Sequence, residues 1–394
     1  MKAVVFHGIG DVRLDEVPEP TITEPTDAIV RLTSSAICGT DLHFIRGTMP
    51  GTKKGRILGH EGVGVVEELG DHVRNLNVGD RVVIPSTIAC GTCVYCRAGY
   101  YAQCDVANPN GPGTAFFGGP EDAGGFDGLQ AELARIPYAN VGLVKLPDEV
   151  DDDQAILISD ILPTAYQAAE MAEVTDGDVV CVFGCGPVGQ FAIWSAKHLG
   201  AGRVIAVDTI ADRLDAAREQ GAEVVDFEAE DPVELIQEMT RGIGPDRVID
   251  AVGVDANRGP GSDDEKHDQA LEEIAPDRVE SGSQWRAGSG PTQVLEWAVE
   301  VVAKAGTISL IGVYPPTVER FPIGAAMMKN LTITMGNCNH RRYIPSLVEL
   351  VRAGSLDPSA LVSQHEPVAS AIDAYEQFDR REQGWLKVEL EPVA

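Results

Sequence analysis

The sequence of 394 residues is poor in basic side chains and contains no long apolar segment. Lysine and arginine together number 31, against 61 acidic residues, so the formal net charge is −30. Such a charge repels nucleic acids and anionic lipid surfaces. No apolar run reaches about 18 residues, and the first residues lack a basic region followed by an apolar stretch. We therefore expect a cytoplasmic protein that binds neither nucleic acid nor a membrane.

The few basic residues are strongly skewed, with nine lysines and 22 arginines. The acidic residues are dispersed through the chain instead of forming one tail. A dispersed acidic surface that stays hydrated in concentrated salt is one explanation, which predicts a halophilic source. The alternative is an acidic, soluble enzyme without any salt adaptation.

The length predicts two domains, because single hydrophobic cores stop growing at about 250–300 residues. Short β-rich runs separated by glycine and proline fill the chain up to about position 150, which is typical of an irregular barrel. From about residue 161, strands alternate with helices, a pattern that predicts βαβ units and a parallel sheet. Residues 254–290 are polar and glycine-rich and interrupt this alternation, so we interpret them as an insertion with at most one short helix.

The glycines Gly184, Gly186 and Gly189 follow the strand VVCVF and open a helix, with Pro187 and Val188 completing the motif. The first glycine permits a tight turn, the second a close approach of backbone to a pyrophosphate, and the third close helix packing. The free N–H groups at the helix N-terminus then face the phosphates. This context predicts a dinucleotide-binding site.

The acidic residue Asp208 ends the next strand, VIAVD. Its carboxylate is placed to accept hydrogen bonds from the adenosine ribose, and it would repel a 2′-phosphate. We therefore expect NAD as the cofactor. NADP remains an alternative, because Arg213 lies one helical turn further on and would partly offset the negative charge.

Four cysteines, Cys90, Cys93, Cys96 and Cys104, lie close together in one glycine-containing loop. Two-residue gaps let thiolates converge on one tetrahedral zinc ion, and four protein ligands make such a site structural. Reduced thiols or two disulfides are the alternatives. A zinc ribbon that binds nucleic acid would need basic residues here, whereas Arg97 is the single one in this lobe.

A second set of potential ligands is spread widely along the chain and comprises Cys38, His60 and Asp160. Each alone has an ordinary explanation as a buried or hydrogen-bonded residue. Together they offer a thiolate, an imidazole and a carboxylate, which leave one tetrahedral position open for water or substrate.

With the motifs CGTDLH, GHEGVGVV, the cysteine lobe and GCGPVG in this order, the sequence resembles the zinc-containing medium-chain alcohol dehydrogenases. The resemblance covers most of the chain. It implies an α/β fold with a GroES-like, β-rich catalytic domain (1–161 and 338–394, including the lobe 90–104) and a Rossmann domain with a doubly wound parallel sheet (162–337). It also implies two zinc ions per chain, a small alcohol or aldehyde substrate, and a homodimer or homotetramer.

The resemblance also implies roles for single residues. Cys38 and His60 correspond to ligands of the catalytic zinc. Thr40 corresponds to the residue that contacts the alcohol oxygen, and His43 to the far end of a proton relay through the nicotinamide ribose. The remaining correspondences are Asp41 as the carboxylate that orients His60, Glu61 as the acid beside it, Thr164 as a nicotinamide contact, and Lys387 as a pyrophosphate contact.

The third zinc ligand departs from many members of the family, which have cysteine where this chain has Asp160. Exchange of thiolate for carboxylate keeps the charge of the ligand set, so a Lewis acid that stabilises an alkoxide remains plausible. SDILPTAYQA and the insertion are most similar to the glutathione-independent formaldehyde dehydrogenase branch, in which the insertion covers the adenine end of NAD and slows its release. We therefore expect residues 254–290 to lie over the adenosine half of the cofactor; a solvated surface loop or an oligomer contact is the alternative. A polyol or sugar dehydrogenase is the alternative, while a zinc-free quinone reductase or a non-enzymatic zinc protein fits less well.

Overall fold

The computed structural model describes residues 1–279, 282 and 284–392, and the chain divides into two compact units. The first unit comprises residues 1–163, 279–285 and 338–394, and the second comprises 164–278 and 286–337. Relative to the predicted domain ranges, residues 162–163 and 279–285 fall in the first unit. Residues 280, 281 and 283 of the predicted insertion lie outside the described residues.

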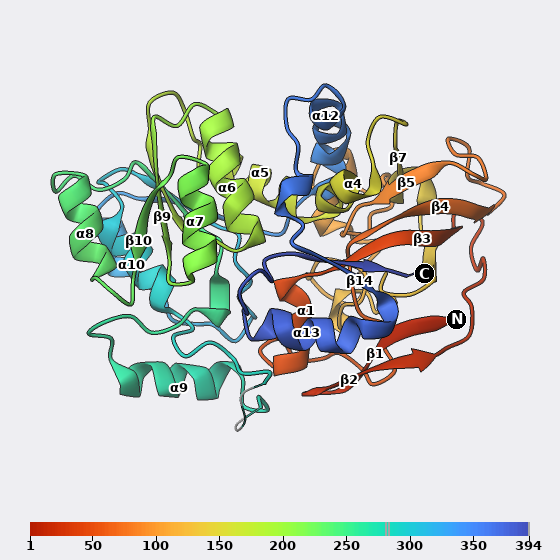
Figure 1. Ribbon diagram of the computed structural model, residues 1–394, viewed down its shortest axis with the longest axis horizontal. Coiled ribbons are helices and arrows are strands. Elements are labelled where there is room, and N and C mark those ends of the chain that lie inside the picture. Colours follow the sequence, from red (N-terminus) through yellow and green to blue (C-terminus); the bar gives the residue numbers. More distant parts are fainter. Residues whose placement is uncertain (280–281, 283, 393–394) are drawn as a thin grey trace. The chain divides into compact units, whose positions relative to one another are not determined.

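The first unit is built on a seven-stranded sheet in which residues near the end of the chain pair with residues near its beginning (Figure 1). The strand order is β14-β15-β3-β4-β5-β7, and β6 pairs with β3. The strands are β3 (Ala28–Ile37), β4 (Gly62–Leu69), β5 (Arg81–Ile84), β6 (Leu133–Ile136), β7 (Val144–Lys145), β14 (Gln364–Pro367) and β15 (Val388–Glu391). A separate hairpin consists of β1 (Lys2–Gly8) and β2 (Asp11–Glu16).

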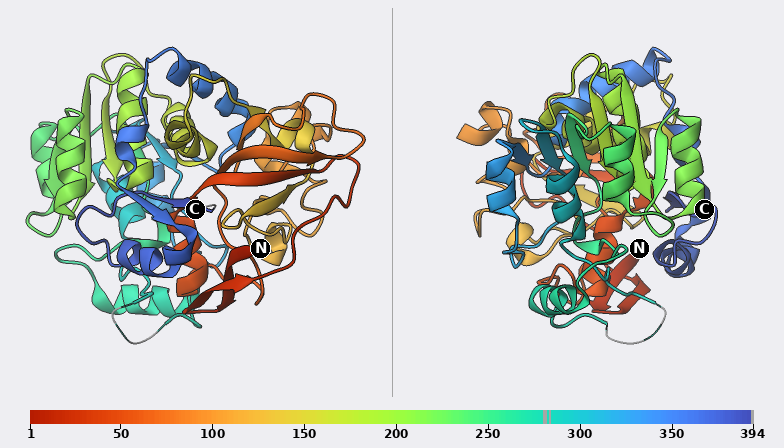
Figure 2. Two further views of the ribbon diagram at one scale, coloured as in Figure 1. Left: turned by 45° about the vertical axis from the view of Figure 1, so that its right-hand side comes forward. Right: turned by 90° about the vertical axis from the view of Figure 1, so that its left-hand side faces the viewer.

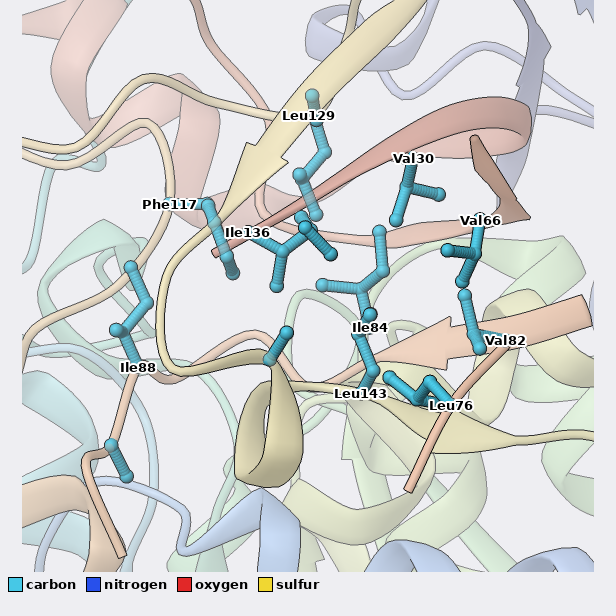
Figure 3. Packing of buried hydrophobic residues seen from close by; sticks show 14 of the residues in the cluster. Val30, Val66, Leu76, Val82, Ile84, Ile88, Phe117, Leu129, Ile136 and Leu143 are labelled. Carbon is cyan, nitrogen blue, oxygen red and sulfur yellow. The ribbon is translucent and has the colours of Figure 1, made fainter. Parts of the chain in front are cut away.

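The long strand β3 organises this unit because it pairs with β4, β6 and β15, all antiparallel. Alternating apolar residues on β3, β4 and β5 give one face to a core that includes Val30, Val66 and Ile84 (Figure 3). Burial of each such aliphatic side chain stabilises the folded state by about 1.5–3 kcal/mol relative to its exposure to water. The helices around the sheet are α1 (Gly39–Arg46), α2 (Val94–Arg97), α3 (Ala139–Gly142), α4 (Asp152–Ser159), α12 (His340–Arg352) and α13 (Ala371–Asp379).

The second unit is a six-stranded parallel sheet with the order β10-β9-β8-β11-β12-β13. Its strands are β8 (Val179–Phe183), β9 (Arg203–Asp208), β10 (Glu223–Asp226), β11 (Arg247–Asp250), β12 (Thr307–Leu310) and β13 (Thr332–Met335). Helices cover both faces of this sheet (Figure 2). The helices of this unit are α5 (Ile161–Met171, which begins in the first unit), α6 (Pro187–His198), α7 (Ala211–Glu219), α8 (Pro232–Met239), α10 (Gln293–Val301) and α11 (Ile323–Met328), and α9 (Asp264–Ile274) lies apart from the sheet in the inserted segment (Figure 1).

This strand order confirms the predicted doubly wound sheet. The order reverses between β8 and β11, and ligands in such sheets bind beyond the carboxyl ends of the strands at that point. Within the predicted insertion, the helix α9 spans 11 residues. Among the described residues, no helix combines the length and the apolar character needed to cross a membrane.

Candidate metal centres and dinucleotide site

Three segment ends of the first unit bring Cys38, His60 and Asp160 together. Cys38 follows β3 and precedes α1, His60 lies just before β4, and Asp160 follows α4. All three are buried, at 9, 3 and 8% exposure. Their ligand atoms, with that of Glu61, lie within 4.8 Å of one another.

The separations within this cluster fit one tetrahedral zinc ion. Oδ2 of Asp160 lies 3.8 Å from Sγ of Cys38 and 3.5 Å from Nε2 of His60. Zinc bonds of about 2.0–2.3 Å at tetrahedral angles place ligand atoms roughly 3.3–3.8 Å apart. One thiolate, one imidazole and one carboxylate would leave a fourth position open.

The electrostatics of the cluster indicate a need for positive charge. Burial raises the pKa of the Cys38 thiol. Burial opposes protonation of His60, but the adjacent carboxylates, above all Asp41, outweigh it and raise the pKa of His60 well above its usual range. Hydrogen bonds from His340 and His60 overcome burial and hold the pKa of Asp160 well below its usual range. A divalent cation would supply the same charge and keep Cys38 ionised.

A hydrogen-bonded chain fixes the orientation of His60. Oδ1 of Asp41 lies 3.2 Å from Nδ1 of His60, and the backbone N–H of Cys38 donates to Oδ2 of Asp41 at 3.0 Å. The amide of Gln130 donates to the same Oδ2, and the hydroxyl of Tyr375 donates to Gln130 at 2.8 Å. Nδ1 is thereby occupied, so Nε2 faces the cluster, as in metal-binding histidines generally.

The structure assigns an orienting partner to Asp160 that sequence reasoning missed. Nε2 of His340 lies 2.7 Å from Oδ1 of Asp160, and Nδ1 lies 3.2 Å from the hydroxyl of Thr87. His340 is 3% exposed. It begins α12, far along the chain from Asp160, and no local motif distinguishes it, so only the fold reveals the contact.

Glu61 and Lys387 form a fully buried ion pair beside the cluster. Nζ of Lys387 lies 2.6 and 2.7 Å from the carboxylate oxygens of Glu61 and donates to the carbonyl of Ile37 at 3.1 Å. The two side chains are 0 and 1% exposed. The pyrophosphate contact of Lys387 therefore stays a prediction, and the observed pairing favours neutralisation of Glu61 as its role.

The other predicted catalytic residues lie along α1. Thr40 is half-buried at the second position of the helix. His43 is 4% exposed, and its Nδ1 lies 2.9 Å from the hydroxyl of Thr48. Thr164, the predicted nicotinamide contact, lies in α5 and belongs to the second unit.

The four-cysteine lobe forms a second cluster whose ligand atoms lie within 4.8 Å of one another. All four cysteines are free, and Sγ of Cys93 lies 4.0 Å from Sγ of Cys104. Backbone N–H groups point at the sulfurs, including those of Cys93 to Cys90 and Cys96 to Cys93. Burial opposes ionisation of Cys90, but hydrogen bonds from Thr92 and from the N–H of Cys93 bring its pKa down to about 6. These features suit a closed zinc site.

The glycine turn of the second unit has the predicted strand–turn–helix context. Gly184 has φ +87°, and a side chain there would meet Val252 at 2.6 Å. A Cβ at Gly189 would lie 1.8 Å from the carbonyl oxygen of Gly184. Gly186 caps α6, and Pro187 and Val188 are the first residues of that helix. Glycine is therefore needed twice for backbone packing, and the helix N-terminus is suited to a phosphate.

Asp208 lies at the end of β9, 7% exposed, and is held by the turn. The N–H of Cys185 donates to its Oδ2 at 2.7 Å, and those of Thr209 and Ile210 donate to Oδ1. Nη1 of Arg213 lies 3.9 Å from Oδ2. Asp208, which would repel a 2′-phosphate, and Arg213, which would attract one, are therefore adjacent.

The inserted segment is anchored beyond the carboxyl ends of β11 and β12. Val254 donates its N–H to the carbonyl of Val313 at 2.8 Å, and Ile274 of α9 packs in the same cluster as Val254. Asp208 ends β9, on the other side of β8 in the sheet. Placement of the insertion over the adenosine half stays a prediction, and the packing of α9 favours the β11–β12 half.

Comparison with known proteins agrees with this geometry. Residues 24–148 match the alcohol dehydrogenase GroES-like domain, and residues 187–258 match the zinc-binding dehydrogenase family. An uncharacterized zinc-type alcohol dehydrogenase-like protein, AdhB, of Bacillus subtilis (strain 168) is 41% identical, and the match covers 100% of both chains. The chain belongs to the zinc-containing medium-chain alcohol dehydrogenase family. Membership confirms the predicted fold and the predicted class of enzyme, a zinc-dependent alcohol dehydrogenase.

Two further members of similar sequence bear on the predicted branch. The alcohol dehydrogenase TADH from Thermus sp. ATN1 has a solved structure with a TM-score of 0.82 at 37% identity, covering 99% of each chain. The glutathione-independent formaldehyde dehydrogenase of Pseudomonas aeruginosa (strain LESB58) is 36% identical over 79% of this chain and 75% of its own. The family thus includes a relative of the predicted type.

Proposed function

We propose that this zinc-type dehydrogenase interconverts alcohols and aldehydes with NAD, and that formaldehyde, without glutathione, is among its substrates. The observation that carries the proposal is the buried convergence of Cys38, His60 and Asp160 with separations of 3.5 and 3.8 Å. Three protein ligands leave room for a substrate oxygen, whereas a structural site is closed by four.

The residues around the cluster have separate tasks in this proposal. When bound, zinc supplies a Lewis acid that polarises the substrate oxygen. Asp41 keeps Nε2 of His60 directed at the cluster, and His340 holds one oxygen of Asp160 so that the other faces Cys38 and His60. The hydroxyl of Thr40 would take up the alcohol proton while it releases its own proton, and His43, oriented by Thr48, would be the far end of this relay. Lys387 neutralises Glu61 and so keeps a further negative charge from the cluster.

NAD is proposed over NADP because Asp208 ends β9 with its charge largely shielded from water. Its carboxylate already accepts hydrogen bonds from three backbone N–H groups, which hold it in place at the end of β9. A 2′-phosphate beside it would meet a fixed negative charge, and Arg213 offsets that charge only across 3.9 Å. We also propose that the protein is cytoplasmic and forms a homodimer or homotetramer, which a measurement of its molecular mass in solution would test. We further propose that it is adapted to salt, so that it stays active in molar salt.

The proposed function is tested by assaying hydride transfer with ethanol, formaldehyde and sorbitol, each with NAD and with NADP, and without glutathione. We expect NAD reduction with ethanol, which yields acetaldehyde, and with formaldehyde, whose hydrate gives up a hydride as an alcohol does and yields formate. We also expect loss of activity on chelation and recovery on addition of zinc. Turnover of sorbitol alone would favour the polyol dehydrogenase alternative. Absence of hydride transfer from all three would contradict the proposal.

A further inference from the structure

A third group of metal-ligating side chains lies in the first unit and shares no residue with the two clusters described above. It comprises Asp153, His365 and Glu389, whose ligand atoms lie within 4.8 Å of one another. Asp153 is the second residue of α4, His365 lies in β14 and Glu389 in β15. His365 and Glu389 are register partners across the parallel strands, so their side chains project from the same face of the sheet.

The carboxylate of Glu389 is the unusual member of the group. The residue is 3% exposed, and its Oε2 makes no hydrogen bond within the described part of the chain. A buried carboxylate oxygen without a partner destabilises the fold, because the water that it loses on burial is not replaced. Burial raises the pKa of Glu389 to about 7, against the lowering effects of the Ser34 hydroxyl and of His365, and the charges of Asp153 and Asp152 act in the same direction as burial. Something that carries positive charge would stabilise this side chain.

The imidazole of His365 does not supply that charge with good geometry. Its Nδ1 lies 3.5 Å from Oε2 of Glu389, and its Nε2 lies 3.9 Å from Oδ2 of Asp153. Both distances exceed the usual range of about 2.7–3.2 Å for an N–H donor. The 3.5 Å separation is close to the roughly 3.3 Å expected between nitrogen and oxygen ligands of one tetrahedral ion, and the exposed side chain of Asp153 would have to move closer from 3.9 Å.

A further aspartate, Asp152, lies near the group but is engaged with other partners. It pairs with Arg81 and accepts a hydrogen bond from the hydroxyl of Thr33, so its own carboxylate is already satisfied. The side chains of Asp153 and His365 are 49 and 45% exposed, which leaves the group open to solvent and to an entering ion.

We propose that Asp153, His365 and Glu389 bind a third divalent transition-metal ion, for which Zn²⁺ is the probe. One neutral imidazole and two carboxylates balance the charge of a divalent ion, and a nitrogen ligand favours zinc over magnesium or calcium. Three ligands leave the remaining position to water. The site ties β14 and β15, from the end of the chain, to α4, and it goes beyond the catalytic function proposed above.

The test measures zinc bound per chain in the full-length enzyme after equilibration with micromolar free Zn²⁺ at pH 7.5. We expect the parent protein to hold one zinc ion more than the His365→Gln and Glu389→Gln variants. His72→Gln, which removes an exposed imidazole outside all three clusters, should retain the parent content. The difference between parent and variants defines the site, so the result does not depend on the occupancy of the other two centres.

Equal zinc content in the parent and in both variants would overturn the proposal. Glu389 is buried, so its variant could fold poorly, whereas His365 is half exposed and its replacement should leave folding intact; the His365→Gln result is therefore decisive. Histidine NMR gives a second readout. Addition of one equivalent of zinc should shift the ring resonances of His365. Ring resonances that do not change on addition of zinc would also overturn the proposal.

Discussion

The two cysteine-containing clusters of the first unit differ in how their ligands are held. The four-cysteine lobe takes all its ligands from the single segment 90–104, and its sulfurs accept hydrogen bonds from N–H groups of the same loop. The cluster of Cys38, His60 and Asp160 takes three ligands from segment ends that are up to 122 residues apart. Its supporting side chains also come from separate segments: Gln130 lies 89 residues from Asp41, His340 lies 180 residues from Asp160, and Tyr375 lies 245 residues from Gln130. A closed site can be local, whereas a site with an open position needs a fold to hold it.

Removal of the carboxylate ligand is expected to have the largest effect. Asp160→Ala should lower kcat/KM by more than about 100-fold, because loss of a mere orienting partner already lowers activity or metal affinity by 10–100-fold. The circular dichroism spectrum should remain that of the parent. Asp148→Ala, which removes an exposed carboxylate, is the control and should have parental activity. Normal turnover in Asp160→Ala would remove this residue from the ligand set.

Disruption of the lobe should instead affect stability. Cys96→Ser is expected to release one zinc ion and to lower Tm by about 5–10 °C, given roughly 2–4 °C per kcal/mol for proteins of 150–250 residues. Activity of the freshly prepared protein should change little, since no lobe residue is proposed to touch substrate. Calorimetry with zinc analysis measures both effects. Cys181→Ser, at a buried thiol outside the lobe, should keep its zinc, and an immediate loss of turnover in Cys96→Ser would contradict the division of roles.

A smaller effect is expected from the orienting residue His340. His340→Ala should lower kcat/KM by about 10–100-fold and weaken zinc retention during dialysis. This corresponds to about 1.4–2.7 kcal/mol of transition-state stabilisation. His340→Gln, which keeps a hydrogen-bond donor for Asp160, should recover part of the loss. If both variants retain zinc and turnover at the parental level, the contact of 2.7 Å has only a packing role.

The smallest expected change concerns cofactor choice in the second unit. Asp208→Gly should improve the ratio of NADP to NAD use by about tenfold, a change of about 1.4 kcal/mol, because it removes both the ribose partner and the like charge. Steady-state kinetics with each cofactor measure it. Asp212→Gly, at a half-buried position at the start of α7, is the control. Equal use of both cofactors by the parent protein would refute the role of Asp208.

The same difference between local and distant ligands explains which features could be predicted from the sequence. The lobe and the glycine turn could be predicted because their residues are close in sequence and their spacing reflects geometry. The parallel sheet could be predicted from the alternation of strands and helices. The proposed catalytic ligands Cys38 and His60 were predicted from family motifs, and Asp160 was predicted from its place where many family members have cysteine.

Contacts that depend on the return of the chain to the first unit could not be predicted. His340 carries no motif, and its role follows only from α12 lying against α4. The contact of Lys387 with Glu61 was also not predicted, because it depends on the pairing of β15 with β3, which buries the ammonium group against Glu61. Glu389 and His365 are separated in sequence by the whole of α13 and become neighbours only through the pairing of β14 with β15.

The most direct test of the central claim is anomalous X-ray diffraction at the zinc edge from crystals of the enzyme. The account predicts one peak among the four lobe sulfurs and a second within about 2.0–2.3 Å of Cys38 Sγ, His60 Nε2 and Asp160 Oδ2. The second ion should have no fourth protein ligand. Absence of that second peak, or a zinc ion there bound by Glu61 in place of Asp160, would contradict the account.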